Sequence, residues 1–232
     1  MNTEQSWDEY WNKQKKSDNN GYKFIAEFYR KYIIKRTLNY FIKTNFPKQA
    51  KLLHAGCGSG QVDTDLSKIY KITALDISNQ ALNIYSQVNK KRAKTVQGSI
   101  FNLPFKEKSF DGIYNLGVME HFTKEDIQKI LLEFRRVLKN NGCLVLFWPP
   151  EFGSSVTALK FIHFILNKIL CKNIQLHPPE ITRVKSKKQI RKILNKAGFK
   201  LDCYYFGPKD MFTHSIIVAS KLNAGSSSKT KA

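Results

Sequence analysis

The sequence predicts an α/β fold, a Rossmann-like three-layer sandwich in which helices cover both faces of a mostly parallel sheet. Short apolar segments of strand length alternate with segments of helical periodicity along most of the chain. The segment at 143–148 is almost wholly apolar, which is typical of a central parallel strand. A glycine-rich turn follows the first strand, where open sheets of this kind bind their ligands.

The individual elements are expected in a regular order. Strands are predicted at 51–55, 71–76, 93–97, 109–116, 143–148, 200–206 and 213–220. Helices are predicted at 61–70, 79–88 and 186–197, and a longer helix begins at Thr123 and ends at Asn140, Asn141 and Gly142. In this longer helix apolar residues recur with a period of about 3.6, and Asp126 stands three positions after Thr123, as at many helix starts.

Three segments flank or interrupt this alternation. Residues 1–46 are expected to form an N-terminal helical cap, and residues 47–224 the main domain, with a helical insertion at 149–185. Residues 225–232 are low in complexity, which predicts a disordered tail. We expect the cap and the insertion to lie over the carboxyl ends of the strands, where Tyr10 and Trp11 either close over a ligand or pack between helices.

The composition limits the possible classes of protein. With 232 residues, 42% of them hydrophobic, the chain can form one domain with a real core, which excludes a wholly disordered protein. Its 39 Lys and Arg against 18 Asp and Glu give a formal charge of +21, so its surface attracts polyanions such as nucleic acid or an anionic membrane. Neither a leader peptide nor an apolar stretch of about 18 residues is visible. We expect a cytoplasmic protein, with peripheral contact at the inner membrane face left open.

The most informative motif is the glycine loop after the first strand, with Gly56, Cys57, Gly58 and Gly60. Glycine lets the backbone turn tightly and lets a ligand approach it closely. Asp76 ends the second strand, twenty residues after Gly56, and a carboxylate there can accept hydrogen bonds from both hydroxyls of a ribose. The loop and the acid together predict a nucleoside-cofactor site.

The residues after the loop decide which nucleoside fits. A dinucleotide fingerprint counted from Gly56 needs a glycine at position 61, which is Gln61 here. A phosphate-binding P-loop needs Lys and Ser or Thr after its last glycine, and here Gly60 is followed by Gln61 and Val62. The loop therefore favours a smaller ligand that has a ribose and no pyrophosphate.

Several motifs in this order resemble the class I S-adenosylmethionine-dependent methyltransferases, in particular those that act on small molecules in ubiquinone and menaquinone biosynthesis. They are HAGCGSG at 54–60, ALD at 74–76, QGSIFNLPF at 97–105, SFDGIYNLGVMEHF at 109–122 and LLEFRRVLKNNGCLVLFWPP at 131–150. The resemblance implies a seven-stranded sheet whose last strand is antiparallel, and S-adenosylmethionine as cofactor. The residues that it implies at the cofactor are Gly56, Cys57, Gly58 and Gly60 for the methionine portion, Asp76 for the ribose, Ile77, Ser99 and Ile100 around the adenine, and Asn115, Leu116 and Gly117 below the sulfonium.

One position departs from the family pattern. Relatives commonly have Gly-Asp after the third strand, with the carboxylate accepting a hydrogen bond from the adenine amino group, whereas this chain has Gly98 and Ser99. A serine hydroxyl accepts a hydrogen bond more weakly than an anion does. We therefore expect the usual cofactor to bind with reduced affinity.

The candidate catalytic residues are Glu120 and His121, which follow the fourth strand close to the expected position of the methyl group. Either could take a proton from an acceptor, although Glu120 could equally bond backbone amides in a turn and His121 could fill a polar corner. Some relatives bind a metal ion with E-x-x-E-H at this position, but here the first acid is replaced by Gly117. Two ligands do not make a metal site, so none is predicted.

The insertion predicts the substrate class. Residues 156–170 form an unusually apolar helix with a narrow polar stripe, too short to cross a membrane but able to lie on one or to cover an apolar pocket. Residues 151–200 contain eleven Lys or Arg and two acids. A lipid-like or prenylated substrate approached at an anionic surface explains both features, and a buried helix surrounded by solvated lysines explains them equally well.

These observations lead to an S-adenosylmethionine-dependent methyltransferase that acts on a small or amphipathic, lipid-like acceptor. An RNA-directed methyltransferase is the first alternative, because of the charge. Against it, Asn115-Leu116-Gly117-Val118 lacks the aromatic residue that stacks on a flipped base. A non-catalytic cofactor-binding protein with the same fold is the second alternative, against which the glycine loop and Asp76 argue.

Overall fold

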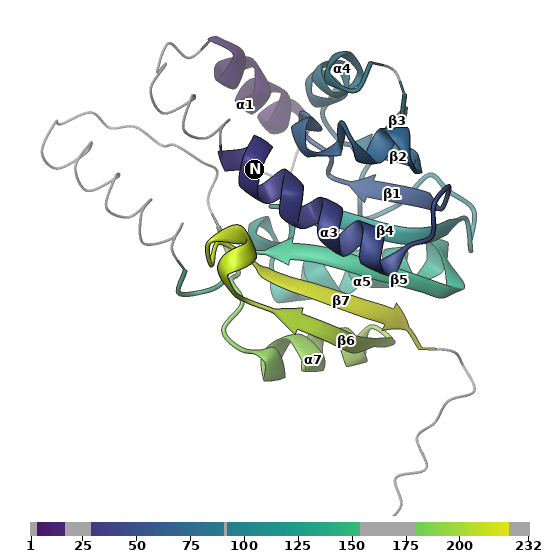
Figure 1. Cartoon of the computed structure of the whole chain (residues 1–232), viewed down its shortest axis with the longest axis vertical. Helices are drawn as coiled ribbons and strands as arrows, with labels where there is room; N and C mark the ends of the chain where they lie inside the picture. Colours follow the sequence, from purple (N-terminus) through teal and green to yellow (C-terminus); the bar gives the residue numbers. More distant parts are fainter. Residues whose placement is uncertain (1–3, 17–28, 91, 154–179, 223–232) are drawn as a thin grey trace, which may run out of the picture.

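The computed structural model describes residues 4–16, 29–90, 92–153 and 180–222 (Figure 1). The strands are β1 (Lys51–Ala55), β2 (Lys71–Asp76), β3 (Lys94–Gln97), β4 (Phe110–Leu116), β5 (Leu138–Trp148), β6 (Phe199–Tyr205) and β7 (Ser215–Lys221). The helices are α1 (Glu4–Lys16), a π-helical turn η1 (Arg30–Ile34) that continues into α3 (Lys35–Asn45), α4 (Asn79–Val88), α5 (Lys124–Val137) and α7 (Lys187–Lys196). Short 3₁₀ turns are η2 (Gln61–Asp63), η3 (Leu66–Lys68), η4 (Met119–His121) and η6 (Pro208–Asp210).

The strands form one seven-stranded sheet in the order β3-β2-β1-β4-β5-β7-β6. The five strands from β1 to β5 run parallel to one another, and β7 is antiparallel to both β5 and β6. The prediction of a mostly parallel sheet with an antiparallel last strand is confirmed. Because β1 to β4 are parallel, the turns that follow them meet at one edge of the sheet, as ligand-binding turns do in open α/β folds.

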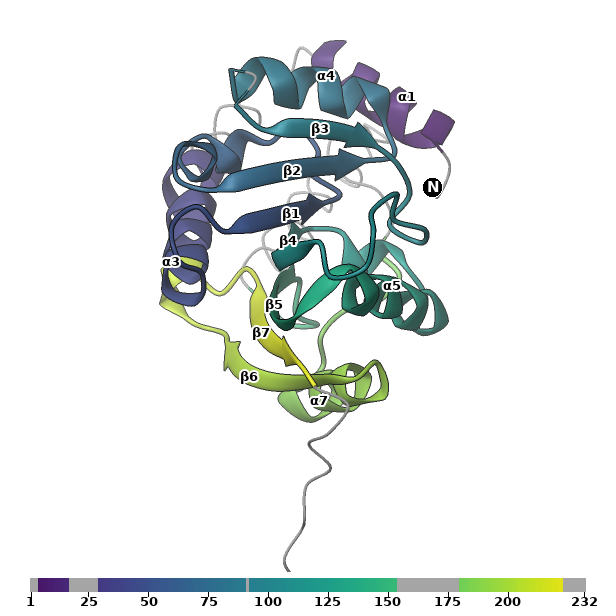
Figure 2. The same cartoon turned by 90° about the vertical axis from the view of Figure 1, so that its right-hand side faces the viewer.

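Helices cover both faces of this sheet (Figure 2). On one face the apolar side chains of α5 and α7, such as Ile130 and Leu194, belong to one buried cluster with residues of β1, β4, β5, β6 and β7. On the other face α3 packs Leu38 and Phe41 against β4 and β5. The periodicity of residues 124–137 thus produced the expected amphipathic helix, and Thr123 caps it by accepting a hydrogen bond from the Asp126 amide.

Two local predictions were wrong. The expected helix at 61–70 is a pair of 3₁₀ turns, η2 and η3, because the Asp63 carboxylate turns inward and bonds buried groups rather than extending a helix into solvent. The residues 140–142 do not end α5, which ends at Val137. They form an irregularity inside β5, where the pairing with β4 shifts between Phe110 and Gly112, because the buried Leu138 already pairs with Phe110.

The cap and the insertion are described in part. The helix α1 lies at the carboxyl edge of the strands as expected, whereas α3 packs on a face of the sheet. The apolar segment at 156–170 and the tail at 225–232 lie outside the described residues. Within the described ranges, no helix is both long enough and apolar enough to cross a membrane.

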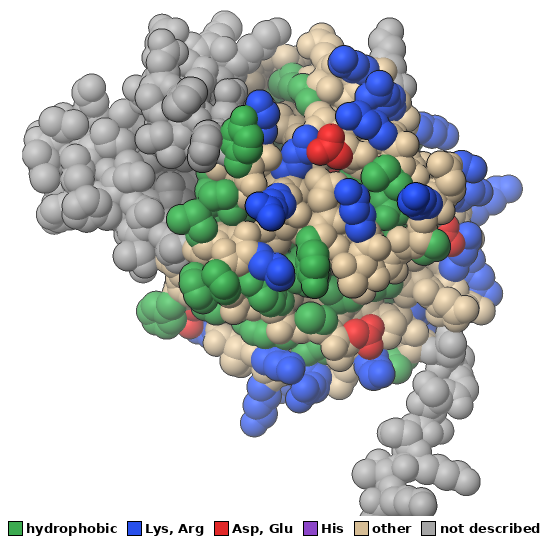
Figure 3. Space-filling view, in the orientation of Figure 1, with side chains coloured by type: hydrophobic (Ala, Val, Ile, Leu, Met, Phe, Trp, Pro, Cys, Tyr) green, Lys and Arg blue, Asp and Glu red, His purple; other side chains and the backbone are tan. Residues whose placement is uncertain are grey.

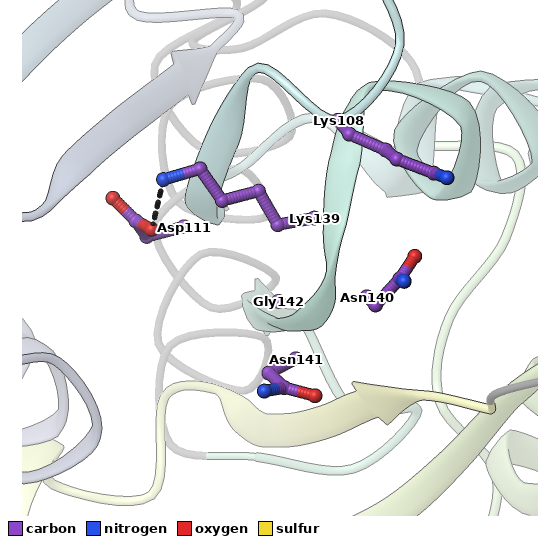
Figure 4. Close-up of a pocket in the computed structure, with 6 residues that line it drawn as sticks. All are labelled: Lys108, Asp111, Lys139, Asn140, Asn141 and Gly142. Carbon is purple, nitrogen blue, oxygen red and sulfur yellow. Dashed lines mark hydrogen bonds and ion pairs between the residues drawn. The ribbon is translucent and has the colours of Figure 1, made fainter.

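A cavity of about 370 Å³ lies at the opposite edge, beside the amino ends of β4 and β5 (Figure 4). Lys108, Asp111, Lys139 and residues 140–142 of β5 line it, and an ion pair of 2.6 Å joins Lys139 to Asp111. The predicted cofactor residues lie at the other ends of these strands, so this cavity is separate from the predicted site.

Candidate active site

The residues predicted to bind a ligand come together at the carboxyl edge of the sheet, toward which the arrowheads of β1, β2 and β3 point in Figure 2. They belong to the ends of four strands and the turns that follow them. These are Gly56, Cys57, Gly58 and Gly60 after β1, Asp76 and Ile77 at β2, Ser99 and Ile100 after β3, and Asn115, Leu116, Gly117, Glu120 and His121 at β4.

The glycine loop turns sharply at each of its glycines. Gly56, Gly58 and Gly60 have φ angles of 71°, 51° and 64°, in the left-handed region that favours glycine. The Gly56 amide donates a hydrogen bond of 2.8 Å to the carbonyl oxygen of Leu75, which ties the loop to the end of β2. A Cβ on Gly58 would lie 2.9 Å from a ring carbon of Trp11, so packing also requires bare backbone here.

The Asp76 carboxylate joins the first two turns. Its Oδ2 accepts a hydrogen bond of 2.8 Å from the Gly58 amide, and its Oδ1 accepts one of 3.0 Å from the Ser78 amide. Burial raises the pKa of Asp76, and these two backbone donors counteract that rise by favouring the anion. Each carboxylate oxygen keeps a lone pair, so two further hydroxyl donors can be accepted at this position.

A buried polar network supports the glycine loop from below. Oδ2 of Asp63 lies 2.6 Å from both His54 Nδ1 and the Tyr85 hydroxyl. The Tyr85 ring fills the space next to Gly60, where a Cβ would lie 2.1 Å from it. Sequence reasoning did not single out Asp63 or Tyr85, because their partners are nine and more residues away and no local motif marks them.

The turn after β4 contains the two candidate catalytic residues. Gly117 has a φ of 64°, and the position of a Cβ on it would lie 3.4 Å from Glu120 Oε1, so the Glu120 carboxyl group faces this glycine. Glu120 is buried, and within the described ranges of the chain its Oε2 has no hydrogen-bond partner. Burial, with a smaller contribution from Glu180, raises the pKa of Glu120 to about 8, although a hydrogen bond from its own backbone and the charge of Arg183 act to lower it. This carboxyl group therefore holds a proton at neutral pH.

Residues from the end of the insertion hold this turn in place. The amides of Ile181 and Thr182 donate hydrogen bonds of 2.6 Å and 3.0 Å to the Glu120 carbonyl oxygen. The Thr182 hydroxyl lies 3.2 Å and 3.1 Å from the carbonyl oxygens of Met119 and Phe122. Sequence reasoning did not identify Thr182, because a threonine about sixty residues away from its partners leaves no local signal.

Helix α1 crosses the same edge and contacts all four turns. Asp8 accepts hydrogen bonds from the Ser78 hydroxyl and the Gln80 amide at the start of α4. Glu4 accepts a bond of 2.6 Å from Gln97 at the end of β3. The Trp7 ring packs edge-on against His121 at 5.4 Å, and Trp11 lies against Gly58. The sequence singled out Trp11 but not Asp8, which caps a helix some seventy residues away.

Ser99 lies in the turn after β3, where its hydroxyl group bonds the backbone. Its hydroxyl oxygen accepts a hydrogen bond of 3.2 Å from the Phe101 amide, so one of its two lone pairs is already engaged. Ile100 is buried and Ile77 is half-buried. In the part of the chain that the structure describes, no three His, Cys, Asp or Glu side chains are grouped to bind a metal ion.

Comparison with known proteins identifies this arrangement. A family model described as a methyltransferase domain matches residues 53–146. The chain is 30% identical, over 224 residues, to the ubiquinone/menaquinone biosynthesis C-methyltransferase UbiE of Campylobacter jejuni, covering 84% of this chain and 86% of that protein. The chain belongs to the class I S-adenosylmethionine-dependent methyltransferases.

Two other relatives match a smaller part of this chain, 43% of it in each case. The chain is 36% identical to an uncharacterized protein of Methanocaldococcus jannaschii and 32% identical to an uncharacterized methyltransferase of Synechocystis. The chain spans 40% and 52% of their lengths, respectively. Among solved structures, the magnesium protoporphyrin IX methyltransferase of Synechocystis with bound SAH superimposes with a TM-score of 0.59 at 20% identity, over 81% of this chain and 83% of that one. This likeness shows the common fold.

The geometry of the edge fits the cofactor of this family. The glycine loop presents backbone without side chains beside the Asp76 carboxylate, which can accept further hydrogen bonds. At the end of β4 the side chain of Asn115 is fully buried, and neither its Nδ2 nor its Oδ1 has a hydrogen-bond partner among the residues that the structure describes. Unpaired buried polar atoms are costly, and a polar ligand at this strand end would satisfy them.

Proposed function

We propose that the protein transfers a methyl group from S-adenosylmethionine to a ring carbon of a reduced quinone. The observation that carries the proposal is the buried Glu120 carboxyl group, which faces Gly117 and whose Oε2 has no hydrogen-bond partner among the described residues. The relatives that match most of this chain include quinone C-methyltransferases. A methylation at carbon requires removal of protons from the acceptor, and this group is a proton acceptor of suitable pKa at the proposed site of transfer.

In this proposal each of the four turns binds a different part of the cofactor. The glycine loop holds the methionine portion through its backbone, and Asp76 accepts hydrogen bonds from the ribose hydroxyls. The side chains of Ile77 and Ile100 enclose the adenine, and Ser99 contacts its amino group. The proposed cofactor contacts are Gly56, Cys57, Gly58, Gly60, Asp76, Ile77, Ser99, Ile100, Asn115, Leu116 and Gly117.

The acceptor chemistry explains why a base is needed. The carbon next to a phenolic hydroxyl is a weak nucleophile, and loss of the hydroxyl proton to Glu120 increases its electron density. The ring carbon then forms its bond to the methyl group while the methyl–sulfur bond breaks, and that electron pair stays on sulfur. Finally the methylated carbon loses its own proton to a base, which restores the aromatic ring. The protein supplies alignment, exclusion of water and the base.

Glu120 must be ionised to take the first proton. Its carboxyl group is protonated in the structure at neutral pH because burial raises its pKa to about 8. A positive charge nearby favours the anion, so the sulfonium of a donor bound beside Gly117 would lower this pKa, and Glu120 would then be able to accept a proton. His121, half-buried beside Trp7, is the second titratable side chain of the turn and is proposed to take the ring proton.

The proposal is tested by incubating the protein with labelled S-adenosylmethionine and a chemically reduced, short-chain 1,4-naphthoquinone that has a free ring carbon. We expect label in a product whose methyl group is bonded to ring carbon, identified by mass spectrometry and NMR. The oxidised quinone is the control, and it should accept no methyl group because it has no hydroxyl proton to lose. A folded protein that binds the cofactor yet methylates oxygen, or neither form of the quinone, would contradict the proposal.

A further inference from the structure

The loop between β6 and β7 lies at the same edge of the sheet as the candidate active site. Ser215, the first residue of β7, pairs with Trp148, the last residue of β5, so this loop leaves the sheet at the carboxyl ends of the parallel strands. Two long-range bonds hold the loop: Tyr29 donates to the Asp210 carbonyl oxygen at 2.8 Å, and Thr37 to that of Lys209 at 2.7 Å. A third, local bond of 2.9 Å joins the Lys209 amide to the Tyr205 hydroxyl.

The held loop turns large apolar side chains toward solvent. Phe206, Met211 and Phe212 are 39%, 53% and 44% exposed. Met211 and Phe212 both have positive φ angles, 57° and 58°, a conformation that is strained for residues other than glycine. Strained backbone persists where the surrounding structure enforces it and is commonly found at functional positions. The backbone conformation of the loop therefore fixes the exposed position of these side chains.

Two more exposed aromatic residues extend this surface. The Tyr40 ring on α3 lies beneath the Lys209 ammonium group, 4.3 Å from it, and is 49% exposed. Phe152 is 79% exposed, and the next residue, Gly153, approaches the loop so closely that a Cβ on it would lie 2.7 Å from the Phe212 carbonyl oxygen. We call the residues Tyr40, Phe152, Phe206, Met211 and Phe212 the apolar loop surface.

The apolar loop surface is bordered by positive charge. Residues 30–45, which form η1 and α3, contain five Lys or Arg and no acid. Arg30, Lys31 and Arg36 among them are exposed, as is Lys209, whereas the acid of the loop, Asp210, is fully buried. Figure 3 shows apolar side chains on the face that carries α3, with Lys and Arg side chains between them.

We propose that the apolar loop surface docks the protein on an anionic lipid bilayer. Aromatic side chains insert at the level of the headgroups, and neighbouring lysines and arginines bind anionic lipid phosphates, so both halves of this surface match a membrane. The candidate active site opens at the same edge of the sheet, and a docked protein can take a lipophilic acceptor without exposing it to water. That last benefit rests on the proposed function, whereas the docking itself does not.

The test is co-sedimentation of the full chain with vesicles of phosphatidylcholine, with and without phosphatidylglycerol. We expect binding to the anionic vesicles and little to the neutral ones. The double variant Phe206→Ser/Phe212→Ser should bind anionic vesicles at least about tenfold more weakly, since the burial of two aromatic side chains is lost. Leu132→Ser is the matched control, because Leu132 is 54% exposed on α5, on the other face of the sheet, and should bind like the wild type.

Charge is tested with a second pair of variants that have the same net charge. Lys31→Glu/Lys209→Glu should lose anionic vesicle binding, whereas Lys188→Glu/Lys192→Glu, on α7, should retain most of it. Equal losses in both pairs, no vesicle binding by the wild type, or a Phe206→Ser/Phe212→Ser variant that binds normally would overturn the proposal. So would binding to RNA that depends on Lys31 and Lys209 with no binding to vesicles, which would assign this surface to a nucleic acid.

The same variants separate this proposal from the proposed function. All should bind S-adenosylmethionine with wild-type affinity and methylate a water-soluble acceptor at the wild-type rate, since none lies in the candidate active site. If no quinol is methylated at all, the vesicle measurements still decide whether the surface binds a membrane.

Discussion

The amide nitrogen of Gly58 lies 2.8 Å from Oδ2 of Asp76, and this bond ties the glycine loop after β1 to the acid at the end of β2. A ligand that bonds Asp76 therefore meets a loop whose position is set by the same carboxylate. The two motifs that the sequence places twenty residues apart form one structural unit.

Asp76→Asn should weaken cofactor binding about tenfold to a hundredfold, measured by calorimetry. A hydrogen bond to a charged group contributes about 1.5–3 kcal/mol, and the amide removes both the charge and one acceptor. Asp111→Asn is the control, because Asp111 pairs with Lys139 at the far edge of the sheet. Unchanged affinity in the Asp76 variant, or an equal effect in the control, would remove Asp76 from the ribose site.

Ser99→Asp should bind the cofactor more tightly than the wild type, again by calorimetry. The hydroxyl of Ser99 already accepts the Phe101 amide, whereas a carboxylate can keep that bond and accept strongly from the adenine amino group. An unchanged dissociation constant in a variant of normal stability would mean that the adenine does not lie against residue 99.

Glu120→Gln should stabilise the protein while removing its activity. The folded state holds a proton on Glu120 up to about pH 8, whereas the unfolded chain loses it near pH 4.5, so the free energy of unfolding falls as the pH rises between these values. The amide cannot ionise, and it should raise stability at pH 8 by a few kcal/mol, with little effect at pH 4. Urea denaturation at the two pH values measures this, and an equal effect at both would mean that Glu120 has an ordinary pKa.

Binding of S-adenosylmethionine near neutral pH should release protons, whereas binding of its neutral demethylated product should release almost none. The sulfonium charge lowers the pKa of Glu120, and the thioether has no such charge. Calorimetry in buffers of different ionisation enthalpy detects the difference, and Glu120→Gln should abolish it. Equal proton release by both ligands would show that the sulfonium does not lie beside this carboxyl group.

Asp8→Asn should loosen α1 and reduce the stability of the protein by about 1 kcal/mol, because Asp8 bonds two groups at the start of α4. Hydrogen exchange in residues 4–12 should accelerate. Glu9→Gln is the matched control, since Glu9 lies next to it and is exposed. Identical exchange in the two variants would mean that the Asp8 contacts do not hold the helix.

The local sequence was enough to predict most strands of the sheet and the residues that form the turns after β1 to β4. Short apolar segments indicate strands, and the spacing of its glycines indicates the glycine loop. The prediction failed at residues 61–70, where the sequence has helical character but Asp63 bonds His54 and Tyr85 instead. Asp8 and Thr182 were missed for the same physical reason: a common polar residue acquires its role from a partner far along the chain, and nothing beside it in the sequence records that partner.

The position of α1 bears on which step of the proposed reaction limits its rate. Since this one helix touches the ends of β1, β2, β3 and β4, we expect exchange of a nucleoside bound among them to require several of these contacts to break together. Departure of the spent donor should then be slower than methyl transfer, and a rapid-quench experiment should record one fast turnover per molecule before a slower steady rate.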